Sequence, residues 1–586
     1  MTDDVRFMWD TPVPMRDGVK LSTDIYLPAA AEAYPVILAR TPYDNIAPRM
    51  VEAAQFFSAR GYAVVLQDAR GRFDSEGHFE PRVNEGKDGY DTIEWIAEQP
   101  WSNGKIGMMG GSYGGTVQWL AARERPPHLT TVVTSVTGGM RWMHDENYMN
   151  GKFPVFQFRW LNMTGGRTMQ HYPFEPLTSH QPGVASPYNF NKLIRTRPLK
   201  DVDKVVGRTN TYWRTWLERN TYDEYWQQMS FEDYFELVDL PALHITGWFD
   251  NCQWGEMYMY SGMAARSPGG DKQWLLVGPW DHAGSANPQP RLGDLEFTQA
   301  AVLDIRAIHL RWFDYWLKGE ENGQADDAKV RIFTMGRNSW RDEPAWPVRG
   351  MEEPVAFYLH SGGAADLFPE GGRQGEPGAG CGTLDLTPPG EEAGDRYVYD
   401  PEDPVPSVED AESPDPIRDS HVLAMDFRYA LRRADVLTYT SAPLTEELEI
   451  TGTAFITLYA ASDCVDTDWV ALLCDLRPDG SSVPLTSAVM RASYRAGADK
   501  IDSPAPSPIT PGQVYQYTIE FMATSMAFQP GHCLQLAVTS SLYPAYDLNP
   551  NTGAPVGEDL PSRPANQTIY HCAEYPSHLL LPEVKR

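Results

Sequence analysis

A serine set among glycines is the residue of this chain best placed for chemistry. Ser112 stands in the run Gly110-Gly111-Ser112-Tyr113-Gly114, after the apolar segment 105–109 and before a segment, 116–122, that is expected to be a helix. Between a strand and a helix, such a turn lifts the serine hydroxyl clear of the sheet. A side chain at the glycine two positions before or after the serine is expected to clash. The pattern predicts a serine nucleophile that attacks a carbonyl group.

A serine nucleophile needs a base to take its proton. In the α/β-hydrolase fold, which this turn indicates, the acid and the histidine follow the serine along the chain, on loops after later strands. His282 follows the apolar run 274–277 and is the only one of thirteen histidines on a loop just past a late strand. It is predicted to take the serine proton and later to protonate the leaving group.

Two aspartates are candidates for the acid that orients the histidine. Asp250 follows the apolar run 243–246, and Asp281 is the direct neighbour of His282. Neighbours in sequence rarely place a carboxylate against a ring nitrogen, so Asp250 is preferred as the acceptor of the histidine Nδ1–H. The alternative interpretation is that Asp250 only caps a helix that begins near residue 253.

The negative oxygen that forms during acyl transfer needs two hydrogen-bond donors. One is predicted to be the backbone N–H of Tyr113, the residue after the nucleophile. The other should come from the loop after the apolar run 35–39. This loop has no glycine run to offer an amide, but Tyr43 offers a phenol. From spacing alone, Tyr43 fits a packing role as well as a catalytic one.

The first part of the chain alternates short apolar runs with helical segments, which predicts a parallel sheet covered on both faces. A hairpin is expected to open it, at 7–13 and 19–27. The expected strands are 35–39, 63–67, 105–109, 130–135, 243–246 and 274–277, with helices at 49–59, 86–98, 116–122 and 300–317. The last of these helices is expected to close the sheet domain.

Two other parts of the chain depart from this alternation. Residues 141–237 lose the strand pattern and are rich in aromatic and charged residues, with helical runs at 209–218 and 223–231, so a helical cap insertion is predicted. After a loop-rich stretch, 361–420, regular short strands predict a β-sandwich, taken to be a jelly roll. The expected strands are 448–459, 468–476, 488–494, 515–521, 532–539 and 566–570.

The predicted architecture is therefore an α/β-hydrolase core with a helical cap insertion and a C-terminal jelly-roll domain. The core is expected in two parts, 1–140 and 239–350, with the cap at 141–238 and the jelly roll at 351–586. A chain of 586 residues is too long for one hydrophobic core, which agrees with a division into several domains.

Composition limits the partners and the location. The net charge is −30, which argues against nucleic acid and against anionic membranes. No apolar run is long enough for a membrane helix, and residues 1–6 do not resemble a signal peptide, so a cytoplasmic protein is expected. The six cysteines show no zinc spacing and are expected to be reduced and mostly buried. No metal and no other cofactor is predicted, and the oligomeric state, a homo-oligomer included, stays open.

Several motifs together resemble the CocE/NonD hydrolases, which include bacterial cocaine esterase, α-amino acid ester hydrolases and the catalytic region of X-Pro dipeptidyl-peptidases. The resemblance rests on 84–105 followed by the Ser112 turn. It extends over 40–43, 68–71, 247–250, 278–282 and 540–553, the last with Asp547, Asn549, Pro550 and Thr552. It implies three domains with the active site where they meet. It also implies that Ser112, Asp250 and His282 form a catalytic triad and that the Tyr43 hydroxyl binds the oxyanion.

The resemblance implies a serine esterase acting on small-molecule esters, with amides as further substrates. An aminopeptidase or α-amino-ester acylase is the alternative, but residues 251–253 carry no acid to hold a substrate ammonium, and only Asp145 or Glu146 offers one. The core also begins within ten residues of the start, unlike that of X-Pro dipeptidyl-peptidases. A non-catalytic binding protein is the remote alternative. Aromatic residues are expected to form the substrate pocket, namely Trp142, Phe156, Phe158, Trp160, Phe249 and Trp254.

Overall fold

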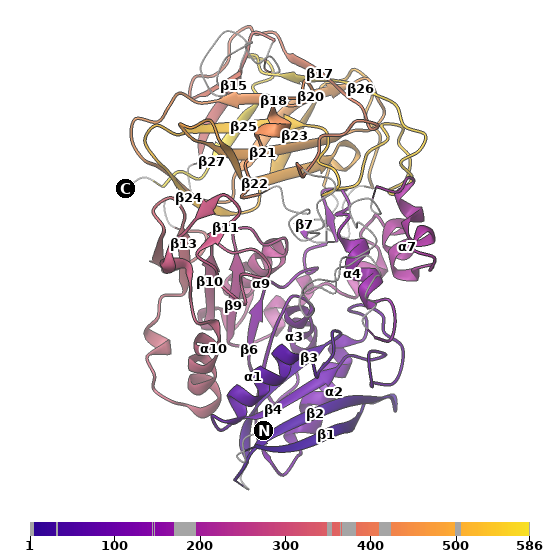
Figure 1. Ribbon diagram of the computed structural model, residues 1–586, viewed down its shortest axis with the longest axis vertical. Coiled ribbons are helices and arrows are strands. Elements are labelled where there is room, and N and C mark those ends of the chain that lie inside the picture. Colours follow the sequence, from indigo (N-terminus) through magenta and orange to yellow (C-terminus); the bar gives the residue numbers. More distant parts are fainter. Residues whose placement is uncertain are drawn as a thin grey trace, which may run out of the picture.

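The structure is a computed structural model of the 586-residue chain. It describes residues 5–30, 33–142, 144–145, 147–168, 195–348, 354–363, 365, 382–409, 423–497 and 505–584. Two strand-rich bodies form most of the molecule, one with helices around its sheet and one built almost wholly of strands (Figure 1). The helices α4 (Gln157–Thr164) and α7 (Thr211–Glu218) lie between the two bodies on one side.

The first body is built on a ten-stranded sheet whose interior is parallel. From β4 to β13 every neighbouring pair is parallel, whereas β1–β2, β2–β4 and β13–β14 are antiparallel. The strand order is β1 (Val5–Pro14), β2 (Lys20–Pro28), β4 (Ala63–Asp68), β3 (Tyr34–Thr41), β5 (Ser102–Gly111), β6 (Leu129–Ser135), β9 (Ala242–Gly247), β10 (Gln273–Gly278), β13 (Val330–Thr334) and β14 (Ser339–Glu343). The predicted α/β architecture is confirmed.

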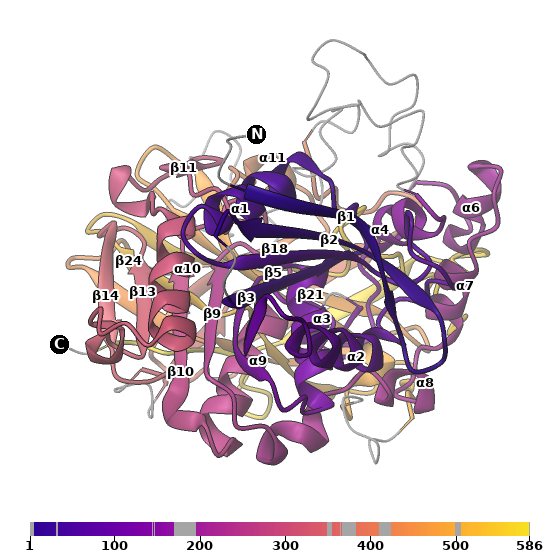
Figure 2. The ribbon, with the colours of Figure 1, turned by 90° about the horizontal axis from the view of Figure 1, so that it is seen from below.

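Helices cover both faces of this sheet, as the alternation of side chains along β3 shows. Val36 and Leu38 pack with residues of α2 (Glu85–Ala97), α3 (Tyr113–Arg123) and α9 (Gln253–Arg266). Ile37 and Ala39 point the other way, to α1 (Pro48–Ser58) and α10 (Ile305–Phe313). Figure 2 shows α1 and α10 on one side of the strands and α2, α3 and α9 on the other. Burial on both faces explains why these strands read as continuous apolar runs.

The predicted helix 300–317 is wrong in two respects. A 3₁₀ turn, Gln299–Ala301, comes first, and α10 begins only at Ile305, where the Asp304 side chain accepts the N–H of Ala307 at 3.0 Å. A wider π turn, Asp314–Lys318, follows α10. The helix also does not close the sheet domain, because β13 and β14 come after it and extend the sheet. These two strands are five residues each and were not expected from their pattern.

The cap packs around its tryptophans. Trp213, Trp216 and Trp226 are buried among other aromatic rings of the insertion. The predicted helix 223–231 is shorter in the structure, since α8 spans only Glu224–Gln227. The insertion also holds two short strands that were not expected, β7 (His144–Asp145) and β8 (Tyr148–Met149). A further short helix is α6 (Val202–Val205).

The C-terminal body is mostly sheet. One sheet has the order β17 (Asp395–Tyr399), β26 (Ala565–Tyr570), β20 (Phe455–Ser462), β27 (His578–Leu581), β15 (Val355–His360), β16 (Gly382–Asp385), β18 (Leu437–Thr440), β25 (Cys533–Thr539), β21 (Asp468–Leu476) and β22 (Ser482–Arg491), with β23 (Tyr515–Glu520) against β20. A second pairs β19 (Leu448–Gly452) with β24 (Thr524–Phe528). The strand expected at 448–459 is thus two strands, and the stretch expected to be loop holds β16 and β17. The jelly-roll connectivity stays a prediction.

Buried ion pairs and hydrogen bonds connect the cap to the C-terminal body. Lys152 Nζ lies 2.5 Å from Asp468 Oδ2, and Arg491 bonds both Asp468 (2.9 Å) and Asp547 (2.8 Å). Asp547 also accepts the N–H of Phe153 at 2.8 Å, and Asn549 donates to Asp468 at 2.9 Å. All four charged side chains are at most 5% exposed. Asp547 and Asn549 belong to the stretch that carried the family resemblance. Asp547 contacts the cap directly, and Asn549 supports Asp468, which contacts the cap through Lys152.

Candidate functional site

Ser112 occupies a strained turn between β5 and α3. Its φ of 58° lies in the left-handed region, which is unfavourable for a side chain other than glycine. Its N–H donates to the Ser135 carbonyl at 2.9 Å, and its own carbonyl accepts from the N–H of Gly115 at 2.8 Å. These bonds on both sides hold the strained backbone in place. The serine itself is only partly buried.

The glycines around Ser112 are not equally necessary. A Cβ on Gly110 would lie 2.9 Å from the Gly114 carbonyl oxygen, as expected. A Cβ on Gly114 would meet nothing closer than the Arg40 carbonyl oxygen at 3.9 Å, so the expected clash at that position is wrong. The tighter position is Gly115, where a Cβ would lie 2.3 Å from Thr137 Oγ1. Close packing of α3 on the loop after β6 sets that constraint.

Asp250 and His282 come together at the ends of two neighbouring parallel strands. β9 runs into the loop of Asp250, and β10 runs into the loop of His282. The Nδ1 of His282 lies 2.8 Å from Oδ1 of Asp250. Asp250 is fully buried, and its other oxygen accepts the hydroxyl of Thr246 at 3.1 Å. The histidine side chain is 35% exposed, so the pair joins a buried carboxylate to a ring that reaches solvent.

The competing interpretations of these loops do not match the geometry. The N-cap of α9 is Cys252, and no side chain caps it. Asp250 Oδ1 does accept the Cys252 N–H at 3.1 Å, but within the turn before the helix. The rival acid Asp281 accepts the N–H of Gly284 at 2.7 Å. The strand histidine His244 is fully buried between Glu256 and Gln273, as expected for a core residue.

Tyr43 and Tyr113 pack together with Trp160 of α4. The Nε1–H of Trp160 donates to the phenol oxygen of Tyr43 at 2.7 Å, and its ring lies 5.5 Å from that of Tyr113. The phenol of Tyr113 points into the core, where it donates to Glu85 at 2.9 Å and accepts the Arg82 N–H at 2.7 Å. Burial, and then the charge of Glu85, raise the pKa of Tyr113 far above its usual range. The side chain anchors α3, which leaves the predicted oxyanion role to its backbone N–H.

Arg72 fixes the Tyr43 loop, and no pattern in the sequence pointed to this residue beyond the neighbouring motif 68–71. Its Nε donates to the Pro42 carbonyl and its Nη1 to the Thr164 carbonyl, both at 2.8 Å. Its side chain is fully buried, and this burial lowers its pKa to about 10. One guanidinium thus ties the residue before Tyr43 to the end of the helix that carries Trp160.

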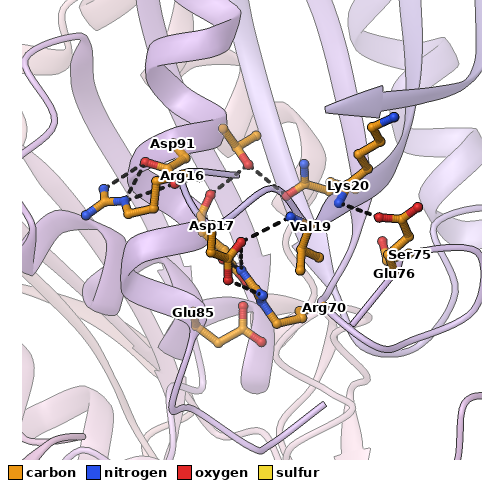
Figure 3. Close-up of polar contacts among 12 residues, drawn as sticks. Arg16, Asp17, Val19, Lys20, Arg70, Ser75, Glu76, Glu85 and Asp91 are labelled. Carbon is orange, nitrogen blue, oxygen red and sulfur yellow. Dashed lines mark hydrogen bonds and ion pairs between the residues drawn. The ribbon is translucent and has the colours of Figure 1, made fainter. Parts of the chain in front are cut away.

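The turn 68–71 is itself held by ion pairs to the opening hairpin and to α2 (Figure 3). Arg70 bonds Asp17 at 2.6 Å and Asp88 of α2 at 2.6 Å. Arg16 donates to Oδ1 of Asp91 from both Nε, at 2.9 Å, and Nη2, at 2.7 Å. The two contacts of Arg70 support the segment from which Arg72 extends.

Two adjoining cavities lie where the cap, the sheet body and the C-terminal body meet. The larger is open to solvent, and its lining includes Phe156 and Asn251, the neighbour of Asp250. The other lining residues of this cavity are mostly apolar: Met149, Pro154, Leu423, Ser487, Met522, Leu542, Ala545 and Tyr546. The lining of the smaller includes Trp254 and Glu520. Met149, Ser487, Met522 and Tyr546 line both.

The predicted aromatic pocket residues are therefore spread over different surroundings. Phe156 and Trp254 line the cavities, and Trp160 contacts Tyr43. Trp142 packs inside the cap against Tyr222 and Trp226, Phe158 is buried there against Trp213, and Phe249 is buried near Phe297. Neither of the two cavities is lined by Trp142, Phe158 or Phe249.

The candidate acids of this region, Glu520 and Asp145, already bond other groups of the protein. Glu520 pairs with Arg141 at 3.3 Å, and that guanidinium lies 5.9 Å from the ring centre of Trp254. Asp145 is fully buried and accepts the backbone N–H groups of Met140 and Arg141, at 2.8 and 3.1 Å. The other candidate for an ammonium ligand, Glu146, lies outside the described residues.

A third side chain stands beside the Asp250–His282 pair. One ligand atom each of Asp250, Cys252 and His282 lie within 4.8 Å of one another. The sequence did not reveal this group, because its members do not follow any metal-binding spacing along the chain. None of the five cysteines within the described ranges is in a disulfide, and Cys381 lies outside those ranges. Among the described helices, none has the length and hydropathy needed to cross a bilayer.

Known families and proteins resemble the chain over nearly its whole length. Residues 17–284 match the family described as X-Pro dipeptidyl-peptidase (S15 family), and residues 322–580 match the X-Pro dipeptidyl-peptidase C-terminal non-catalytic domain. The chain is 33% identical to the cocaine esterase of Rhodococcus sp. (strain MB1 Bresler), with 98% of each covered. It is 26% identical to a putative serine esterase of Mycobacterium tuberculosis (strain CDC 1551 / Oshkosh), with 90% of this chain and 89% of that protein covered.

Solved structures also resemble the chain over nearly its whole length. An α-amino acid ester hydrolase superposes with a TM-score of 0.84 at 28% identity, over 99% of this chain and 97% of the other. An aminopeptidase from a marine sediment archaeon, Thaumarchaeota archaeon, also superposes with a TM-score of 0.84, at 26% identity over the same shares.

Proposed function

The chain belongs to the CocE/NonD family of serine hydrolases, and from this premise we propose that it cleaves carboxylic esters through an acyl-enzyme formed on Ser112. The observation that carries the proposal is the 2.8 Å contact between His282 Nδ1 and Asp250 Oδ1, at the carboxyl ends of two adjacent strands of the sheet that also presents Ser112. Small-molecule esters are the proposed substrates, and amides are further candidates.

Each residue has a defined role in the proposed reaction. His282 removes the Ser112 hydroxyl proton as the oxygen attacks the ester carbonyl, and then gives that proton to the departing alcohol. Asp250 accepts the Nδ1–H, which leaves Nε2 to take up the proton, and it stabilises the charged ring. Water then attacks the acyl-enzyme while His282 takes its proton. His282 returns that proton to Ser112 as the acid is released.

The oxyanion is proposed to bind to two donors, the backbone N–H of Tyr113 and the hydroxyl of Tyr43. Both donors are preorganised, because Tyr113 begins α3 and Tyr43 is held through Trp160 and through Arg72 at Pro42. Fixed donors need no reorganisation as charge develops on the oxygen, which is why such sites lower the barrier.

The substrate is proposed to be an ester whose acyl or alcohol part is apolar. The larger cavity has mainly apolar walls and reaches Asn251, next to the proposed acid. The acid of the smaller cavity, Glu520, is already paired with Arg141, and Asp145 is bonded to backbone N–H groups. This arrangement supports an uncharged substrate over one that carries an ammonium group.

The alternative function is an aminopeptidase or α-amino-ester acylase, favoured by the likeness to an archaeal aminopeptidase and an α-amino acid ester hydrolase. It requires a free amine on the substrate. Matched esters of N-acetylated and free amino acids separate the two proposals. Faster cleavage of the N-acetylated series supports the esterase, whereas a strict need for the free amine supports the alternative.

The domain division is part of the same proposal: two core segments, 1–140 and 239–350, a cap at 141–238 and a C-terminal jelly roll at 351–586. The sheet strands agree with the last boundary, since β14 ends at Glu343 and β15 begins at Val355. A cytoplasmic location stays a prediction, and cell fractionation tests it.

Covalent labelling tests the central assignment. A fluorophosphonate probe should label the wild-type protein and Ser58→Ala, a control on α1, but not Ser112→Ala. Ester hydrolysis should disappear with the label. An unlabelled wild type would favour a non-catalytic binding protein, and ester cleavage retained by Ser112→Ala would rule out this nucleophile.

A further inference from the structure

Cys252 lies beside the proposed acid–base pair, and ester cleavage makes no use of its thiol. It follows Asp250 by two residues, at the start of α9, so the turn that places the carboxylate also places the sulfur. One ligand atom each of Asp250, Cys252 and His282 lie within 4.8 Å of one another. Carboxylate, thiolate and imidazole are the three side-chain ligands that Zn²⁺ takes in proteins.

We propose that Asp250, Cys252 and His282 form an inhibitory site for a zinc-like divalent cation. Zinc bonds of about 2.0 to 2.3 Å place tetrahedral ligands roughly 3 to 4 Å apart, so shifts of about 1 Å or less bring these atoms into range. Three protein ligands leave a fourth position for water. This proposal rests on the proposed function, because the cation would occupy the pair that activates Ser112.

The charges of such a site balance. The Cys252 thiol loses a proton to solvent, and the Asp250 carboxylate is an anion without further change. The His282 ring stays neutral, because its proton moves from Nδ1 to Nε2 and leaves the Nδ1 lone pair for the cation. One thiolate and one carboxylate then neutralise the two positive charges of the cation. Neutrality matters because Asp250 is fully buried and Cys252 is 1% exposed, and an unbalanced charge there would be costly.

Two neighbouring groups favour this site. Asn251 Nδ2 donates to Cys252 Sγ at 3.6 Å, and an N–H directed at sulfur stabilises the thiolate form. Thr246 donates to the second oxygen of Asp250 at 3.1 Å, which orients the carboxylate. The His282 side chain is 35% exposed and provides the side from which a cation can enter.

Binding would stop hydrolysis through the histidine. Once Nδ1 is bonded to the cation it no longer donates to Asp250, and the ring loses the orientation that aims Nε2 at the serine. Soft or borderline cations, Zn²⁺ and Cd²⁺, should inhibit. Mg²⁺ and Ca²⁺ should not, because they prefer sites made of oxygen ligands alone.

The test is a titration of the purified full chain with ZnCl₂ and CdCl₂, after treatment with a reductant and a chelator. Ester hydrolysis is one readout, and the near-ultraviolet absorption of a cadmium–thiolate bond is the other. Cys252→Ser and Cys252→Ala are compared with Cys572→Ser, which removes a partly buried thiol elsewhere. Each variant is scored against its own metal-free rate, and circular dichroism checks its folding.

The expected result is inhibition of the wild type and of Cys572→Ser that a chelator reverses. Both Cys252 variants should need at least about tenfold more metal. Equal inhibition of the Cys252 variants, or a wild type insensitive to both cations, would overturn the proposal. The cadmium absorption does not depend on catalysis, so it tests the metal site separately. If the wild type shows no esterase activity but has a cadmium absorption that the Cys252 variants lack, the proposed function fails and the metal site stands.

Discussion

The indole of Trp160 donates a hydrogen bond to the phenol oxygen of Tyr43 at 2.7 Å. Trp160 belongs to the cap helix α4, and Tyr43 to the loop after β3, so the bond crosses from the cap to the sheet body. A phenol has one proton, and an oxygen that accepts a hydrogen bond becomes a better donor through that proton. The cap thereby prepares the proposed oxyanion donor.

Removal of this bond should slow catalysis only when Tyr43 is present. Tyr43→Phe is expected to lower kcat roughly a hundredfold or more with little change in KM. Trp160→Phe, which keeps an aromatic ring, is expected to lower kcat by about tenfold, the value of one hydrogen bond. In the double variant the Trp160 change should have almost no further effect on kcat.

Steady-state kinetics of the four proteins provide the check. If the two effects on kcat simply multiply, Trp160 does not act through Tyr43. A rise in KM alone for Trp160→Phe would instead assign Trp160 to substrate contact. If Tyr43→Phe has full activity, the proposed oxyanion role of Tyr43 itself is wrong.

Replacement of the two candidate acids, Asp250 and Asp281, should lower kcat to very different extents. Asp250→Asn keeps the shape of the buried side chain but cannot accept the His282 Nδ1–H in the same way, so kcat should fall roughly a thousandfold or more. Asp281→Asn should have a far smaller effect, because an amide oxygen still accepts the Gly284 N–H. A larger loss of kcat for Asp281→Asn than for Asp250→Asn would exchange their roles.

Two glycines of the serine motif should respond differently to alanine. Gly110→Ala forces a Cβ to 2.9 Å from the Gly114 oxygen and should cost about 1 to 3 kcal/mol of unfolding free energy. A Cβ on Gly114 has its nearest neighbour, the Arg40 carbonyl oxygen, at 3.9 Å, and Gly114 lies in the first turn of α3. Gly114→Ala should therefore change the unfolding free energy by no more than about 1 kcal/mol. Urea unfolding compares them. Equal destabilisation would contradict the packing described for this turn.

A buried histidine in the C-terminal body should make stability depend on pH. His571 Nε2 lies 2.9 Å from Asp395 Oδ2, and its Nδ1 lies 3.3 Å from Glu392 Oε2. Burial alone would lower the pKa of His571, but the bond to Asp395 and the charges of both acids outweigh it and raise this pKa. Hydroxyls of Ser361 and Tyr439 also face Asp395, each at 2.7 Å.

Because the folded-state pKa of His571 is raised, its contribution to stability is fully present below the unfolded value of about 6.5 and is lost as the pH rises through the folded value. The wild type should therefore exceed His571→Gln in unfolding free energy most near pH 6 or below, and the gap should narrow toward higher pH. The matched control is His128→Gln, a surface ring 45% exposed beside Glu94, which should change little. A gap that widens with pH would reverse the assigned direction.

Much of the site could be predicted from local patterns. Ser112 was found from flanking glycines between a strand and a helix, and His282 and Asp250 from their places after apolar runs. Parallel strands bring all their carboxyl ends to one edge of the sheet, so a loop after one strand is near a loop after its neighbour. The interior strands from β4 to β10 were predicted close to their observed bounds because burial on both faces makes them continuous apolar runs. The short strand β13 and the edge strand β14 after it were not predicted.

The tertiary structure alone decided the contacts that cross between bodies. Trp160 and Tyr43 are 117 residues apart, and Lys152 and Asp468 are 316 apart. Neither pairing can be predicted from the periodicity of apolar residues along the chain, because that periodicity reports only which face of a helix or strand is buried. The meeting of Cys252 with the acid–base pair has the same cause. Its thiol follows Asp250 closely in sequence, but His282 reaches it only because β9 and β10 lie side by side in the folded sheet.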